Sequence, residues 1–266
     1  MNPLLPIGIF DSGIGGLSVA RSVIKLLPHE KIIYYGDTEH LPYGEKSNNS
    51  IIRFSKKITN FLIKKKCKII IIACNSASTV AYTKIKNIKP EIKIINVVDP
   101  VIEEIKQIKK KCNIGLIGTK CTINSKNYDK KIKKNNNKIK LFSLATPLLA
   151  PMIEEKINEN LSANIISSYL SNKKFKNINK MILGCTHYHI IRNNINMFFE
   201  KKVKIFNSNK IVAKYVKNFL ENHNMLNDKK TKKEHEFYVS NYTQSFEKCA
   251  KLFFKNDINL QQHKIK

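Results

Sequence analysis

Two cysteines stand directly after apolar runs, at positions where a thiol could act on a ligand. Cys74 follows the isoleucine-rich run Lys68–Ala73, and Cys185 follows Leu183-Gly184. Each precedes a small polar residue at the start of a predicted helix. Because a helix N-terminus stabilises negative charge, we expect a lowered thiol pKa and a thiolate near neutral pH. His187, two residues beyond Cys185, adds a group that titrates in the physiological range.

Two thiols in matched positions favour acid/base chemistry over a single nucleophile. Inversion at a carbon atom needs a base on one face of the substrate and an acid on the other. The rival for a cysteine pair is a disulfide oxidoreductase, which usually carries CxxC, and the chain has no CxxC. Three cysteines lie beside lysines in predicted helices or at their ends, and we interpret them as buried structural residues: Cys67, Cys112 and Cys249. The role of Cys121, in a polar loop, stays ambiguous.

The segments that must position these thiols alternate between strand and helix. The continuous isoleucine run before Cys74 is typical of a strand buried on both faces of a parallel sheet. Alternating strands and helices predict right-handed βαβ units and a doubly wound α/β sheet. The predicted strands are Leu5–Phe10, Lys31–Tyr35, Lys68–Ala73 and Ile92–Val97, and the predicted helices are Leu17–Leu27, Ser50–Lys66, Ser76–Asn87 and Val101–Lys111.

The second half of the chain repeats landmarks of the first half. Ile7–Ser12 matches Ile114–Thr119 at an offset of 107, and Cys74 matches Cys185 at an offset of 111. Two matches in the same order favour a duplication into two pseudo-symmetric lobes with mostly parallel sheets. Ligands bind outside the carboxyl ends of such strands, so facing lobes would bring both thiols to one cleft. We expect an N-terminal lobe of residues 1–98 with 208–266, and a C-terminal lobe of residues 99–207.

Several segments are expected to lie outside the two repeated cores. Lys130–Lys140 is a low-complexity basic stretch that predicts a solvated loop, and Asn227–Glu236 predicts another charged loop. Phe237–Val239 predicts a strand and Ser245–Phe254 an amphipathic helix, both packed on the first lobe. Asn256–Lys266 is expected to be frayed.

A glycine-rich segment and a polar loop could face a ligand. Asp11–Gly16 superficially resembles a phosphate-binding loop, but it lacks the GxGxxG order and the Walker Lys-Ser/Thr pair. We expect its glycines to let the backbone approach a small ligand, with Asp11 and Ser12 facing it. The loop Gly36–Gly44 by itself indicates a surface turn.

The charge of the chain points first to polyanions. Among 266 residues there are 48 Lys+Arg and 20 Asp+Glu, which gives a formal net charge of +28. Arginine, which makes bidentate contacts to guanine and phosphate, occurs only at Arg21, Arg53 and Arg192. Lysine alone can still hold a phosphate backbone. We interpret the excess as the composition of an A/T-rich genome and do not expect specific nucleic-acid binding.

The ends and apolar runs of the chain favour the cytoplasm. The start has no basic segment followed by a long apolar one, as a secretory signal would. The longest apolar run, Ile69–Cys74, is far shorter than the ~20 residues of a membrane span. We therefore expect a cytoplasmic protein with free thiols and no membrane partner.

An ordered set of motifs covers nearly the whole chain and resembles the glutamate racemases of the aspartate/glutamate racemase family. The strand at 237–239 and its following helix also fit this resemblance. The motifs are Phe10–Gly16, Tyr35–Asp37 with Pro42–Gly44, Ala73–Ser78, Val98–Pro100, Gly118–Thr119 through Ser125 and Tyr128, and Leu183–His187.

The resemblance implies an isomerase that interconverts L- and D-glutamate without cofactor or metal and supplies D-glutamate for peptidoglycan. It implies that Cys74 and Cys185 are the two acid/base residues, with Asp11 beside Cys74 and His187 assisting Cys185. The substrate contacts implied by the resemblance are Asp11, Ser12, Asp37, Tyr43, Gly44, Asn75, Ser76, Thr119, Glu154, Thr186 and His187.

Two departures from the family pattern are mild. Ser76 stands where the family usually has threonine, and Thr146 stands where it usually has cysteine. Neither change removes an acid/base thiol, so we predict an active enzyme. Aspartate, another small amino acid or a hydantoin stays open as the substrate, and a Lys-rich surface stays open as a second binding role. Homodimer formation and activation by a cell-wall precursor also stay open.

Overall fold

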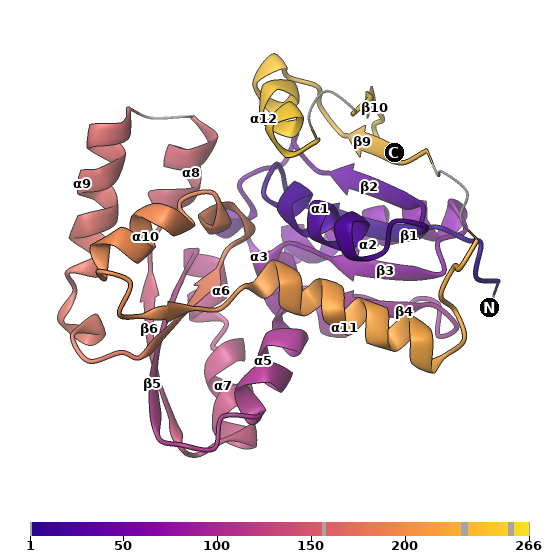
Figure 1. Ribbon diagram of the computed structural model, residues 1–266. Helices are drawn as coiled ribbons and strands as arrows, with labels where there is room; N and C mark the ends of the chain where they lie inside the picture. The colour runs from indigo at the N-terminus through magenta and orange to yellow at the C-terminus, as the bar shows by residue number, and fades with distance from the viewer. Residues whose placement is uncertain (1, 156–157, 230–233, 255–257, 266) are drawn as a thin grey trace.

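The computed structural model describes residues 2–155, 158–229, 234–254 and 258–265. Two β-sheets lie next to each other, and helices cover both (Figure 1). Every described strand pairing in both sheets is parallel. The predicted α/β fold with parallel sheets is therefore confirmed. Within the described residues, no helix combines the length and apolar character that a membrane crossing requires.

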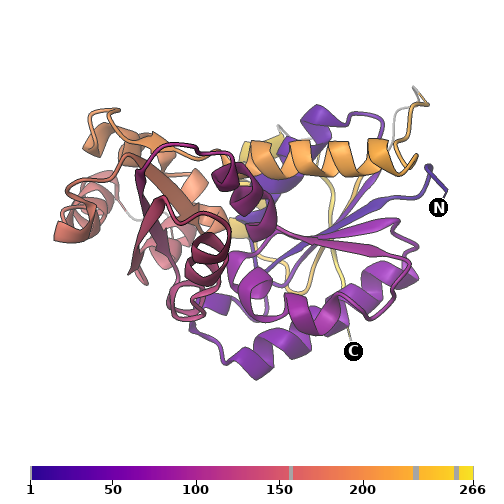
Figure 2. The same cartoon turned by 90° about the horizontal axis from the view of Figure 1, so that it is seen from below.

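The first sheet has six strands in the order β10-β9-β2-β1-β3-β4. Its inner strands are buried on both faces, and the four isoleucines of β3 alternate between two separate apolar clusters. Helices α1 and α11 cover one face and α2 covers the opposite face (Figure 2). The strands are β1 (Ile7–Asp11), β2 (Ile32–Gly36), β3 (Ile69–Ile72), β4 (Lys93–Asn96), β9 (Glu236–Val239) and β10 (Leu260–Gln262).

The second sheet has four strands in the order β6-β5-β7-β8. Two apolar clusters again lie on its two faces, one beneath α8, α9 and α10 and the other beneath α5 and α7. The strands are β5 (Cys112–Gly118), β6 (Ile139–Ala145), β7 (Lys180–Gly184) and β8 (Lys204–Ile205).

The two sheets share one strand order. The run β2-β1-β3-β4 of the first sheet corresponds to β6-β5-β7-β8 of the second. In this correspondence β1 matches β5 and β3 matches β7, as the two sequence landmarks predict. The thiols of Cys74 and Cys185 thus follow equivalent strands, each the immediate neighbour of the strand that opens its repeat.

The helices connect these strands in chain order. The α-helices are α1 (Gly16–Leu26), α2 (Asn48–Lys64), α3 (Asn75–Val80), α4 (Tyr82–Ile85), α5 (Val98–Lys106), α6 (Lys120–Asn124), α7 (Asn127–Asn135), α8 (Leu149–Glu154), α9 (Glu159–Leu170), α10 (Arg192–Phe198), α11 (Ser208–Asn222) and α12 (Gln244–Phe254). Three short 3₁₀ turns complete the set: η1 (Tyr43–Glu45), η2 (Lys173–Phe175) and η3 (Thr186–His189).

Four local predictions need correction, three of them before the C-terminal segment. The helix expected over Ser76–Asn87 is divided at Ala81 into α3 and α4. Most of the Lys130–Lys140 segment is not a loop: α7 includes its first six residues, because Tyr128 and Ile132 pack into the second sheet's core. Cys112 lies in β5 rather than in a helix.

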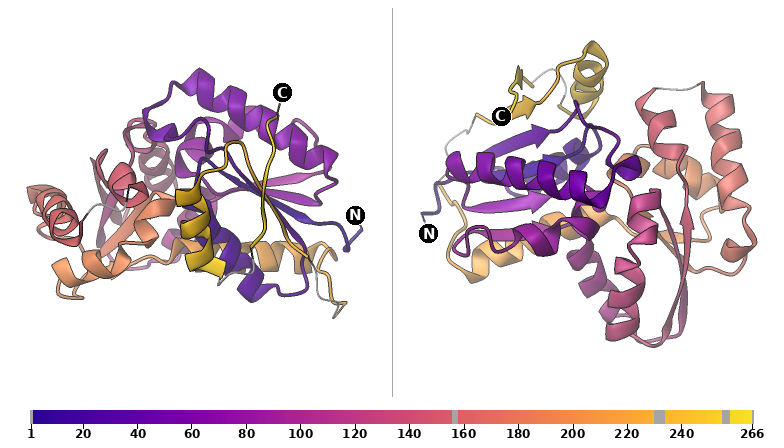
Figure 3. Two further views of the ribbon diagram at one scale, coloured as in Figure 1. Left: turned by 90° about the horizontal axis from the view of Figure 1, so that it is seen from above. Right: turned by 180° about the vertical axis from the view of Figure 1, so that it is seen from behind.

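The C-terminal segment, expected to be frayed, instead adds β10 to the edge of the first sheet. Backbone pairing with β9 orders it. Figure 3 shows this segment against the first sheet, well away from α9 of the second. The expected loop at 227–236 includes residues outside the described ranges at 230–233, and the tail expected to be frayed, 256–266, includes such residues at 256–257 and 266.

Candidate active site

A pocket lies between the two sheets, where β3 and β7 end. Its wall comes from both halves of the chain, as expected for two facing repeats with binding sites at their strand ends. The lining residues are Ser12, Pro42, Tyr43, Gly44, Cys74, Asn75, Ser76, Thr119, Ala150, Glu154, Gly184, Cys185, Thr186 and His187.

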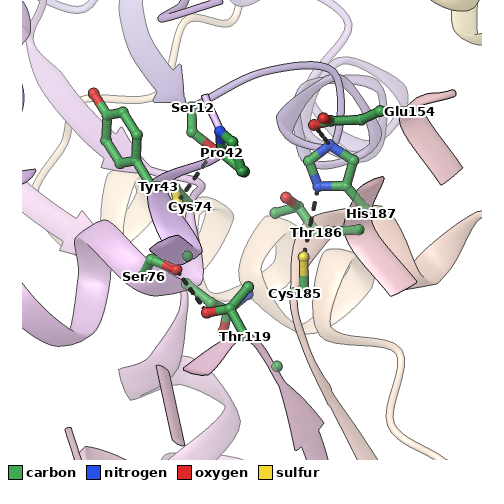
Figure 4. A pocket seen from close by; sticks show the side chains of 14 residues that line it. Ser12, Pro42, Tyr43, Cys74, Ser76, Thr119, Glu154, Cys185, Thr186 and His187 are labelled. Atoms are coloured by element: carbon green, nitrogen blue, oxygen red, sulfur yellow. Dashed lines mark hydrogen bonds and ion pairs between the residues drawn. The ribbon is translucent and has the colours of Figure 1, made fainter. Parts of the chain in front are cut away.

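The two predicted thiols lie on opposite walls of this pocket (Figure 4). Cys74 is the N-cap residue of α3 and is 5% exposed, and Cys185 is the N-cap residue of η3 and is 6% exposed. Both side chains are thus nearly withdrawn from water, and a small ligand in the pocket would lie between them.

Cys185 belongs to a chain of three interacting side chains. The Nδ1 atom of His187 lies 3.5 Å from Sγ of Cys185, and its Nε2 atom lies 2.7 Å from Oε1 of Glu154. Burial disfavours the imidazolium, but the sulfur on one side and the carboxylate on the other outweigh it and raise the pKa of His187 well above its usual value. A protonated His187 can then donate to a Cys185 thiolate.

Cys74 has a different environment. Its thiol lies 3.6 Å from Oγ of Ser12. Burial, followed by the nearby Asp11 carboxylate, raises the pKa of Cys74 well above its usual value. The expected lowering of this pKa by a helix N-terminus is therefore wrong for Cys74, because desolvation and a like charge outweigh the hydrogen bonds that oppose them. Cys74 rests as a thiol.

Asp11 is fully buried and holds the glycine-rich loop. Its Oδ2 accepts hydrogen bonds from the backbone N–H groups of Gly13 and Gly16, both at 3.0 Å, and its Oδ1 lies 3.4 Å from the hydroxyl of Thr186. Burial raises the pKa of Asp11, although His187 and the two N–H donors oppose this shift. The carboxylate acts on Cys74 through its charge and does not line the pocket wall.

The glycines of this loop have a different use from the one expected. A Cβ atom added at Gly15 would lie 2.3 Å from Oγ1 of Thr186, and one added at Gly16 would lie 2.3 Å from Cβ of Asp11. They allow the first sheet's loop to touch η3 of the second repeat and to wrap around Asp11. Gly44 makes a similar close approach to Thr119, with 2.7 Å to its Cβ.

Hydroxyl groups connect the two halves of the pocket wall. The hydroxyl of Ser76, on α3, lies 3.0 Å from that of Thr119, which in turn donates to Thr122 at 3.1 Å (Figure 4 draws the first contact). On the first-sheet side, the phenol of Tyr43 donates to Oδ2 of Asp37 at 2.5 Å. The pocket therefore has fixed hydroxyl groups on both walls.

The pocket includes most of the substrate residues implied by the resemblance. Asp11 and Asp37 lie behind its wall, where they hold the glycine-rich loop and Tyr43 respectively. Three lining residues were missed: Pro42, Ala150 and Gly184. Each adjoins or falls within a segment that the sequence marks out, but apolar or small side chains carry no chemical signal of their own.

Within the part of the chain that the structure describes, no group of three or more His, Cys, Asp and Glu side chains is placed to hold a metal ion. The thiol and carboxylate side chains that line the pocket instead contact other side chains: Cys74 contacts Ser12, and Cys185 and Glu154 contact the two ring nitrogens of His187. The arrangement can accept a proton at one wall and donate a proton at the other.

Comparison with known proteins gives consistent matches over almost the full length. A sequence model of the Asp/Glu/Hydantoin racemase family matches residues 7–216. The glutamate racemase of Lactobacillus acidophilus is 34% identical over 97% of this chain and 96% of its own. The crystal structure of glutamate racemase from Francisella tularensis in complex with D-glutamate superposes with a TM-score of 0.91, at 33% identity and 99% coverage of both chains. A glutamate racemase isoform from Bacillus anthracis has a TM-score of 0.92 at 30% identity, covering 98% of this chain and 97% of that one.

Proposed function

The chain belongs to the family of aspartate, glutamate and hydantoin racemases, and from this premise we propose that it interconverts L- and D-glutamate by proton transfer between two thiols. The protein is a racemase, an isomerase of the α/β class. The observation that carries the proposal is the placement of Cys74 and Cys185 on opposite walls of one pocket. The similarity to enzymes named glutamate racemases, one solved with D-glutamate, supports glutamate over aspartate or a hydantoin.

The proposed reaction begins with Cys185 as base. Its thiolate, paired with the His187 imidazolium, takes the α-proton of the enantiomer whose Cα–H bond faces it, and the electron pair of that bond remains on the substrate. The Cys74 thiol then donates its proton to the opposite face of the same carbon. Cys185 ends as a thiol and Cys74 as a thiolate, so the reverse reaction starts from the exchanged state. Positioned acid and base groups contribute typically ~10²–10⁴-fold.

The remaining rate must come from stabilising the carbanion, whose charge spreads onto the substrate carboxylate. Preorganised donors in a water-poor site are suited to this. We propose that Asn75, Ser76 and Thr186 supply such donors, from both walls of the pocket. The other proposed substrate contacts are Ser12, Tyr43, Gly44, Thr119, Glu154 and His187, with Asp11 and Asp37 acting from behind the wall.

The lobe boundaries and the cellular role are part of the same proposal. Residues 1–98 with 208–266 form one lobe and residues 99–207 the other, a division supported by the return of β9 and β10 to the first sheet. We propose that D-glutamate from this reaction supplies peptidoglycan synthesis in the cytoplasm. Homodimer formation stays a prediction, which sedimentation velocity can check.

One assay tests the activity. Purified protein with L-glutamate in D₂O is expected to form D-glutamate that carries deuterium at Cα, and the reverse direction is expected to behave alike. L-Aspartate and a 5-substituted hydantoin serve as competing substrates. Absence of exchange with either glutamate enantiomer would refute the proposal. Cys74→Ser and Cys185→Ser are each expected to abolish racemisation, and full activity in either variant would exclude the two-thiol mechanism.

A further inference from the structure

A buried tyrosine from the second repeat contacts a pocket residue of the first. Asn75 is the first residue of α3, lines the pocket and is 6% exposed. Its Oδ1 atom accepts a hydrogen bond of 2.8 Å from the hydroxyl of Tyr128. Tyr128 lies on α7, which packs against β6 of the second sheet. The bond therefore joins elements that belong to different sheets.

The direction of this bond determines what the Asn75 amide can do. An asparagine side chain has one acceptor oxygen and one NH₂ group that only donates. Half a turn of the amide would replace this bond by one from Nδ2 to the phenol oxygen, but in the observed orientation Oδ1 is taken by Tyr128. Its Nδ2 atom is then the group left to donate to a ligand. Burial raises the pKa of Tyr128, with a smaller contribution from Asp99, so the phenol stays a neutral donor.

The hydroxyl of Tyr128 is not explained by packing. Its ring, 2% exposed, belongs to an apolar cluster with Val98, Val101 and Ile132, which a phenylalanine could fill equally well. A buried hydroxyl without a partner costs about 1–3 kcal/mol, so in such a cluster a hydroxyl is retained only where it has a partner. That partner is a residue of the pocket wall.

We propose that Tyr128 is a positioning residue for racemisation, which orients Asn75 so that its NH₂ group donates to the substrate carboxylate. This inference rests on the proposed function. The next residue of α3 is also held from the second repeat, through the 3.0 Å contact between the hydroxyls of Ser76 and Thr119. Contacts from the second repeat thus hold two adjacent polar side chains of the pocket wall.

The test is the kinetics of Tyr128→Phe in both reaction directions. The variant is expected to lower kcat/KM about 10-fold, mostly through kcat, because the donor is lost where charge develops on the carboxylate. The two enantiomers have equal free energies, so the loss must be the same in both directions. Tyr35→Phe is the matched control: it removes another buried tyrosine's 2.8 Å hydrogen bond, to the carbonyl of His263 on the far edge of the first sheet. Its kinetics are expected to stay within twofold.

A double-mutant cycle separates positioning from simple packing. If Tyr128 acts through Asn75, Tyr128→Phe has little further effect once Asn75→Ala is present. A loss of the same size in both backgrounds, or unchanged kinetics in Tyr128→Phe, would overturn the proposal. Asn75→Asp gives an independent arm, because a carboxylate can still accept from Tyr128 but cannot donate to the substrate. It is expected to lose more activity than Tyr128→Phe, and full activity would also overturn the proposal.

Two checks keep the outcomes distinguishable. Circular dichroism melting reports whether each variant is folded. If Tyr128→Phe does not fold, the activity of Asn75→Asp decides whether the proposal stands. If the unaltered protein does not racemise glutamate, the proposed function itself fails, and with it the positioning role. That result is seen before any variant is compared.

Discussion

Glu154 contacts the imidazole that lies beside Cys185, and if Cys185 is the proposed base, replacing Glu154 should weaken it. The change is Glu154→Gln, which keeps the size of the side chain and removes its charge. The carboxylate lies 2.7 Å from Nε2 of His187, and the side chains of Glu154 and His187 are 12% and 5% exposed. Solvent therefore screens the pair little, and the pKa of His187 should fall when the charge is lost.

The expected loss follows from the strength of that contact. Hydrogen bonds to charged groups contribute about 1.5–3 kcal/mol, and a factor of ten in an equilibrium corresponds to about 1.4 kcal/mol. The population of the Cys185 thiolate with its imidazolium should fall about 10–100-fold, and kcat/KM with it. Since the free energies of the enantiomers are equal, both directions must lose the same factor.

The assay measures initial rates in both directions and the labelling of thiols by iodoacetamide at neutral pH. In the unaltered protein Cys185 is expected to react before Cys74, and in Glu154→Gln this preference should shrink. Glu155→Gln is the matched control, since the neighbouring Glu155 is exposed and does not line the pocket. A kcat/KM within threefold of the unaltered protein would refute the reasoning. So would an equal loss in a His187→Gln background, where the carboxylate has no imidazolium to hold.

Three further changes test the frame around the site. Gly15→Ala should lower kcat/KM at least about 100-fold in the racemisation assay, because its Cβ would lie 2.3 Å from Oγ1 of Thr186 and force the walls apart. Lys68→Met leaves the buried Glu30 carboxylate without its 2.6 Å ion pair, so urea unfolding at pH 7 should show a loss of about 3–5 kcal/mol. Although burial opposes it, hydrogen bonds hold the pKa of Glu236 at about 2, below its unfolded value. Its stabilisation should therefore be present above about pH 4.5 and be lost as the pH falls towards 2, and the melting temperature of Glu236→Gln should fall less over this range.

Most of the fold was predictable because the sequence patterns that indicate its strands and helices are local. The isoleucine run before Cys74 marks a strand buried on both faces, and its four isoleucines do alternate between two apolar clusters. The order of landmarks also predicted which strands are equivalent, as the shared strand order confirms. Helix α7 was missed because lysines dominate its composition, whereas only Tyr128 and Ile132 are buried in it.

The electrostatics of the site were not predictable in the same way. A helix N-terminus after Cys74 indicates a lowered pKa when only neighbours in sequence are considered. The full burial of the thiol and the charge of Asp11, which lies 63 positions away in the chain, reverse that shift. The contact of Tyr128 with Asn75 spans 53 positions, and no residue pattern marks it. Such effects depend on distances between elements, which local patterns do not contain.

The two thiols occupy equivalent places in a repeated fold, yet their surroundings are unlike. Equal free energies of the enantiomers require equal kcat/KM in both directions, so this inequality cannot favour one product. It can set the protonation state in which the empty enzyme rests. Burial and the charge of Asp11 raise the pKa of Cys74, so in the proposed mechanism the empty enzyme keeps its transferable proton on Cys74. In the proposed mechanism each turnover leaves the proton on the other thiol, and because both thiols are nearly buried, we expect its return without substrate to be limited by the access of water to the pocket.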